Sequence, residues 1–140
     1  MKSFIKEGCS LLVLKRGESL VEQLGNFARE QKLKSAWINI IGGAANVTLG
    51  FYDLGAREYK WQEFDEELEI TGLQGNLVWL DDEPFWHVHG TFSRIDYSVI
   101  GGHIKELTVG LTAEVILKPI EESLTREYDE ETGLKLICPL

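Results

Sequence analysis

The stretch "PFWHVHGTFSRIDYSVIGGH", residues 84–103, carries the pattern that decides the fold. In its first half Trp86, Val88 and Phe92 alternate with polar residues, which predicts a strand with one buried face. The polar segment at 93–99 then has the length and composition of a hairpin connection. We therefore expect the chain to turn back here and its two arms to pair as antiparallel strands.

The same stretch holds all three histidines of the chain. His87 and His89 fall on the polar face of the predicted strand, roughly 6.6 Å apart along it. The hairpin would bring His103 opposite them, and Gly101 and Gly102 would leave room for close backbone approach. Three neutral imidazoles can bind Zn²⁺ or a related divalent transition metal and leave a fourth position open. The spacing favours such a metal site, with ordinary hydrogen-bonded strand histidines as the alternative.

An amphipathic helix is predicted within residues 16–34, on the N-terminal side of this stretch. Its apolar residues recur at helical spacing, at Leu20, Val21, Leu24, Phe27 and Ala28. Ser19 and Glu22 have the spacing of a capping box, in which side chains satisfy the free N–H groups of the first turn.

Elsewhere the polarity pattern has a period of two. Strands are predicted at 3–7, 9–15, 57–63, 67–80, 85–94 and 108–118. Residues 35–44, "SAWINIIGGA", have little polar surface and are expected to form a strand covered on both faces. A short helix is expected at 121–131, followed by a final strand or docking arm in "LKLIC". Because the spacing between strands suits hairpins, the predicted class is α+β, a mainly antiparallel β-sheet packed by a few helices.

Length and composition predict one domain over residues 1–140, with a C-terminal extension at 121–140. No apolar run approaches the length of a membrane span, and no signal peptide is evident, so we expect a cytoplasmic protein without a membrane partner. Cys9 and Cys138 are expected to be free thiols there. The net charge of -9 argues against direct DNA binding, because an acidic field repels phosphate backbones.

The chain resembles the PPC (plant and prokaryote conserved) domain over about residues 5–120, the expected core. The resemblance lies in "RGESLVEQL", "IGGAANVTLGFYD", "EELEITGLQGNL", "TAEVIL" and, most specifically, His-x-His followed by Gly-Gly-His. It implies a homotrimer and a metal, recorded as zinc in some relatives, held here by His87, His89 and His103. No AT-hook motif is present, and Tyr97 follows Asp96 where many relatives have glycine, so the turn could differ.

Three functions remain open at this point. The first is a ligand- or partner-binding regulatory module, a trimer whose zinc site stabilises the assembly or receives a small anionic ligand. The second is a metal-dependent enzyme of unknown substrate that uses metal-bound water, with Glu114 as a candidate proton carrier; a salt bridge is the alternative role of Glu114. The third is a DNA-associated regulatory protein. We favour the module, because nothing beyond the histidines looks assembled for chemistry.

Overall fold

The computed structural model describes residues 1–6 and 8–137, and over these residues it has one helix and nine strands. The fold is α+β with an antiparallel sheet, which confirms the predicted class. The elements are β1 (Lys2–Lys6), β2 (Cys9–Lys15), α1 (Leu20–Glu30), β3 (Ser35–Asp53), β4 (Glu58–Phe64), β5 (Leu68–Leu80), β6 (Glu83–Ser93), β7 (Val99–Ile120), β8 (Arg126–Tyr128) and β9 (Lys135–Ile137).

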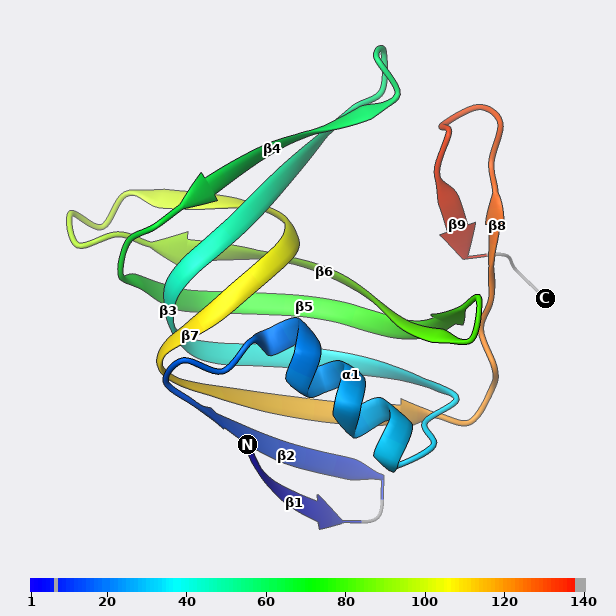
Figure 1. Cartoon of the computed structure of the whole chain (residues 1–140), viewed down its shortest axis with the longest axis horizontal. Coiled ribbons are helices and arrows are strands. Elements are labelled where there is room, and N and C mark those ends of the chain that lie inside the picture. The colour runs from blue at the N-terminus through cyan, green and yellow to red at the C-terminus, as the bar shows by residue number, and fades with distance from the viewer. Residues whose placement is uncertain (7, 138–140) are drawn as a thin grey trace.

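The main sheet has seven strands in the order β1-β2-β7-β6-β5-β3-β4. The two longest strands, β3 and β7, also pair with each other, so β3, β5, β6 and β7 each have two neighbours within this group of four. The sheet therefore closes into a ring, and Figure 1 shows β3 and β7 crossing the view beside each other as they bend. Irregular register near Gly42, Ala44 and Asn46 in β3 marks the bend.

Helix α1 begins as the sequence predicts. Ser19 is its N-cap, and the Ser19 hydroxyl accepts a hydrogen bond of 3.3 Å from the backbone N–H of Glu22. Leu20, Leu24 and Phe27 are buried in the core, and the helix lies across one face of the sheet (Figure 1). Within the described ranges, no helix has both the length and the apolar character needed to cross a bilayer.

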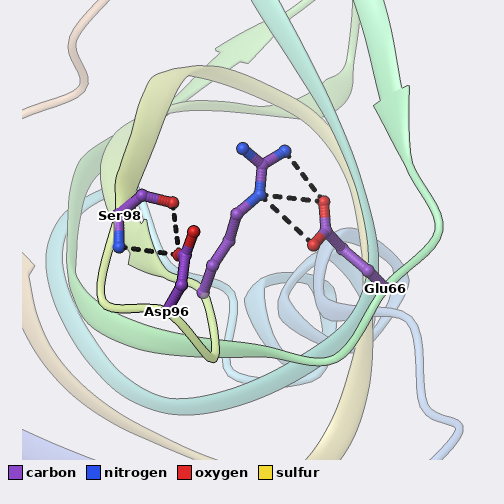
Figure 2. A network of polar contacts seen from close by, with 4 residues as sticks. Glu66, Asp96 and Ser98 are labelled. Carbon is purple, nitrogen blue, oxygen red and sulfur yellow. Dashed lines mark hydrogen bonds and ion pairs between the residues drawn. The ribbon is translucent and has the colours of Figure 1, made fainter.

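The turn between β6 and β7 confirms the predicted hairpin. Asp96 accepts hydrogen bonds from the backbone N–H of Ser98 at 2.9 Å and from its hydroxyl at 2.6 Å (Figure 2). Arg94 donates to the Glu66 carboxylate at 2.9–3.2 Å, which ties the turn to the start of β5. Tyr97 takes a φ of 65°, in the left-handed region that favours glycine, so tyrosine occupies a backbone position suited to glycine.

The C-terminal segment corrects one prediction. The structure has no helix at 121–131; β8 and β9 form a two-stranded hairpin there instead. Local polar contacts favour the turn, because the Asp129 carboxylate accepts from the Thr132 N–H at 2.7 Å and from its hydroxyl at 2.6 Å. Gly133 completes it with a φ of 77°.

Other predictions also change. Over the described residues one helix covers the sheet rather than a few. The strand at 35–44 is buried on one face only, because Trp37 is 41% and Ile41 58% exposed in the single chain. Cys9 has a free thiol, as expected, whereas Cys138 lies outside the described residues, as does residue 7 of the predicted first strand.

Candidate metal centre

Apolar and polar residues alternate along β6, and this alternation places His87 and His89 on the same face of the strand. Trp86 and Val88 are 7% and 3% exposed and point into the core, which leaves His87 and His89 on the opposite face. The β6–β7 register places His103 directly across from His89. The hairpin thus brings the three histidines together, as the sequence predicted.

The imidazole nitrogens converge on one point. Nε2 of His87 lies 3.0 Å from Nε2 of His89, and Nδ1 of His103 lies 3.3 Å from the same His89 atom. The three ligand atoms all lie within 4.8 Å of one another, so the group could hold a metal ion. A tetrahedral ion with bonds of ~2.0–2.1 Å sets its ligand nitrogens roughly 3.4 Å apart, which these distances approach.

The rings are held in the neutral form that binds metals. Burial is the main cause that lowers the pKa of His87 to about 4, and the charge of Arg126 and the neighbouring His89 contribute. Burial also lowers the pKa of His103 to about 4, followed by the effects of His87, His89 and Arg126. Burial lowers the pKa of His89 as well. At neutral pH the three rings therefore offer lone pairs rather than charge.

An aromatic wall, formed by Tyr59 and Trp61 on β4, stands beside His103. The ring centroids of Tyr59 and His103 are 5.0 Å apart, and those of Trp61 and His103 are 5.8 Å apart. Gly50 lies between Trp61 and His103 in the sheet register, and a Cβ there would lie 2.4 Å from Cζ3 of Trp61. The absence of a side chain at Gly50 thus lets the indole lie across β3 toward the cluster.

The predicted close approach at the paired glycines is present. A Cβ on Gly102 would lie 2.8 Å from the carbonyl oxygen of Gly50, and one on Gly101 would lie 2.6 Å from that of Gly90. These contacts hold β7 against β3 and β6 next to His103.

The C-terminal hairpin reaches the cluster from the other side. Nη2 of Arg126 lies 3.1 Å from Nδ1 of His87 and donates to Oδ1 of Asn76 at 3.2 Å. The guanidinium is partly buried, its Cζ lies 5.1 Å from the Phe85 ring centre, and no carboxylate among the described residues pairs with it. A cationic group therefore stands beside three neutral imidazoles.

His89 is the exposed member of the cluster. It opens on a depression of about 480 Å³ lined by Gly72, Gln74, Gly90, Thr91 and Gly102. The ring of His89 is therefore reachable from solvent through this depression.

Glu114 lies elsewhere. It is exposed on β7, opposite Val13 of β2 and Ile41 of β3, and is not a member of the ligand cluster. The structure thus brings the three histidines together and leaves Glu114 apart. Its suggested role as a proton carrier stays a prediction.

Sequence reasoning missed several residues that surround the cluster. Tyr59, Trp61, Asn76 and Arg126 come from three strands far apart in the chain. A signal was present at 59–61, where two aromatic residues share one strand face. Arg126 fell within the helix predicted at 121–131, so the sequence gave no indication that its side chain lies beside His87.

Comparisons with known proteins agree with this architecture. The sequence matches the family model of the Plants and Prokaryotes Conserved (PCC) domain over residues 8–121. A metal-containing protein from Archaeoglobus fulgidus is 37% identical, with a TM-score of 0.89 and coverage of 99% of this chain and 100% of that chain. A comparison with curated proteins gives no match.

Two further crystal structures are similar over the whole length. A plant- and prokaryote-conserved protein from Pyrococcus horikoshii is 29% identical, with a TM-score of 0.87 and coverage of 99% of this chain and 96% of that chain. A presumed DNA-binding protein from Bacteroides thetaiotaomicron is 26% identical, with a TM-score of 0.93 and coverage of 98% and 96%.

Proposed function

This chain belongs to the Plants and Prokaryotes Conserved domain family, and from that premise we propose that it is a homotrimeric metal-binding module whose three-histidine centre receives a small anionic ligand. The observation that carries the proposal is the convergence of the three imidazole nitrogens within 4.8 Å. The metal-containing relative from Archaeoglobus fulgidus supports it. His87, His89 and His103 would hold the ion, with Zn²⁺ as the expected metal because imidazole nitrogen suits it.

The anionic ligand follows from charge. Three neutral imidazoles leave the charge of a divalent ion uncompensated, and no carboxylate belongs to the described cluster. Arg126 adds a further positive charge beside His87. A bound ion would supply a coordination position for an oxygen ligand, and the depression next to His89 would give that ligand access.

The trimer is supported by an apolar outer face. His89 lies opposite Gln74, Gln74 opposite Asn39, and Asn39 opposite Ile116, so the histidines share a sheet face with the end of β7. This face also exposes Trp37 and Ile41, and Ile116 is 38% exposed. Exposed large apolar residues grouped on one sheet face are typical of a subunit contact.

Two alternatives have less support. DNA binding is suggested by the name of the relative from Bacteroides thetaiotaomicron, but a net charge of -9 opposes it. A metal-dependent enzyme would need a proton-transfer group near the metal, and Glu114 lies outside the cluster.

The metal content of purified protein tests the proposal. Protein prepared without chelator should contain about one divalent ion per chain, and His89→Ala should lose it, because a ligand is removed. Gln74→Ala, at the neighbouring cross-strand position, is the matched control and should keep the metal. An unchanged metal content in His89→Ala would contradict the assignment.

A further inference from the structure

The turn between β6 and β7 presents apolar side chains to solvent at one end of the sheet (Figure 1). In the single chain Ile95 is 97% and Tyr97 is 86% exposed, and both border a hollow of about 390 Å³. Leu111, which is also exposed, lines the same hollow. Single apolar residues are common on protein surfaces, but three large ones around one hollow are typical of a contact surface.

Polar contacts hold this turn in one conformation. The Arg94 N–H donates to the Ser98 carbonyl oxygen at 2.9 Å, and the Tyr97 N–H donates to the Arg94 carbonyl oxygen at 2.9 Å. The bonds of Asp96 to Ser98 and of Arg94 to Glu66 add to them (Figure 2). These contacts keep Tyr97 at its left-handed φ of 65°. A turn that is already ordered loses little backbone freedom when a partner binds to it.

Two carboxylates give the surface around the turn a negative charge. Glu67 and Glu69 line the hollow, and neither pairs with a basic side chain in residues 1–6 and 8–137. Arg94 also lines it, but Glu66 matches its charge at 2.9 Å. The turn surface is thus defined by Ile95, Tyr97, Leu111, Glu67 and Glu69. A complementary partner should be apolar and carry positive charge.

The outer face of the sheet carries a second and different surface. A groove of about 510 Å³ lies there, and its lining includes Leu11, Ile41, Glu114 and Ile116. Lys118 lies two residues from Ile116 and so points to the same face. Lys2 joins this face through Val13, which pairs with both Lys2 and Glu114. The groove surface, defined by these four lining residues and the two lysines, therefore has more positive than negative charge.

A ring of three copies needs two different contact surfaces on each copy. In such a ring the contact is heterologous, so one patch of a copy meets a different patch of the next. The apolar outer face supplies only one of the two. The turn surface and the groove surface are both apolar and have opposite charge, and the turn projects from the sheet whereas the groove is recessed. The two surfaces therefore suit each other.

We propose, on the basis of the proposed homotrimer, that the turn surface of one copy docks in the groove surface of the next. Gly72 and Gln74 line both the groove and the depression beside His89. A turn seated in the groove therefore borders that depression as well. The neighbouring copy forms part of the wall of the ligand site, which is complete only in the assembled ring.

Mixing two variants tests this pairing of surfaces. Tyr97→Asp places a charge on the turn surface and Ile116→Asp places one on the groove surface, so each variant alone should sediment as a monomer. An equimolar mixture should form a species of about twice 15.9 kDa, because the intact groove of the first variant can receive the intact turn of the second. The ring cannot close in the mixture, since no copy carries both surfaces. A mixture that stays monomeric would overturn the pairing.

A matched control separates this pairing from a general effect of surface charge. Phe51 is 72% exposed on β3 and belongs to neither surface, so Phe51→Asp should keep the trimer mass. Loss of the trimer in Phe51→Asp would overturn the inference. A monomeric unsubstituted protein removes this inference and the proposed trimer together, whereas a Tyr97→Asp variant of trimer mass removes this inference alone.

Cysteine cross-linking tests whether the turn reaches the ligand site. The double variant Tyr97→Cys, Gln74→Cys should form covalent trimers on oxidation, because a disulfide requires Cα atoms only ~4.4–6.8 Å apart. Tyr97→Cys with Glu106→Cys is the control, because Glu106 is exposed on β7 and does not line the groove. It should stay uncoupled. Absence of covalent trimers in the first variant, or equal amounts in both, would overturn the inference.

Discussion

Acidification of the metal-free protein should destabilise it through the histidine cluster. In the folded protein the pKa of His103 is about 4, whereas the ordinary pKa of a histidine, expected in the unfolded chain, is 6.5. The pKa of His87 is likewise lowered to about 4 in the folded protein. Because the folded pKa is the lower one, the unfolded chain binds more protons between these two values. Stability is therefore full above pH 6.5 and falls as the pH drops toward 4.

The magnitude follows from the two pKa values. For one ring, the linkage relation gives a loss of about 2 kcal/mol at pH 5 relative to pH 7. This is a large part of the roughly 5–15 kcal/mol that stabilises a typical domain. The cause is burial of the ring, which disfavours the imidazolium, reinforced by the other histidines and Arg126.

Urea unfolding of chelator-treated protein, followed by tryptophan fluorescence, measures this loss. The free energy of unfolding should fall between pH 7 and pH 5, and His103→Gln should lose about 2 kcal/mol less over the same interval. Carboxylates elsewhere in the chain also titrate between pH 7 and pH 5, but they do so equally in both proteins. The difference between the two losses therefore isolates the contribution of His103. Equal losses in the two proteins would refute the reasoning.

Three further predictions concern packing, assembly and DNA. Gly90→Ala should lower the free energy of unfolding in urea by about 1–3 kcal/mol, because its Cβ would lie 2.6 Å from the backbone carbonyl oxygen of Gly72. Gly72→Ala should cost less, because a Cβ at Gly72 has nothing within 4 Å, and equal effects would contradict this. Sedimentation should give a molecular mass of about three times 15.9 kDa for the unsubstituted protein, and Ile116→Asp should lower that mass. A monomeric mass for the unsubstituted protein would contradict the proposed trimer. Duplex DNA should bind undetectably at physiological salt, so tight binding would overturn the charge argument.

Local patterns predicted the elements on which the site depends. The alternation of Trp86, Val88 and Phe92 defined the buried face of β6, and the polar turn after it brought His103 back to His89. Spacing at Ser19 and Glu22 located the start of α1. Each of these features is determined by residues that are close together in the sequence, so the pattern of one short segment is enough to predict it.

Features that depend on closure of the sheet were not predictable in this way. Trp61 reaches His103 only because Gly50 separates them in two different strand pairings. Arg126 reaches His87 because the C-terminal residues form a hairpin, whereas their acidic, polar pattern also suited a helix. Arg126 and His87 are 39 residues apart in the sequence, and Arg126 and Asn76 are 50 residues apart, so no local periodicity records these contacts.

Anomalous diffraction from crystals grown with zinc tests the metal centre most directly. The account predicts one strong peak per chain above the zinc absorption edge, at ~2.0–2.1 Å from a nitrogen of each of His87, His89 and His103. A map without that peak, or with zinc bound only at other residues, would contradict the central claim.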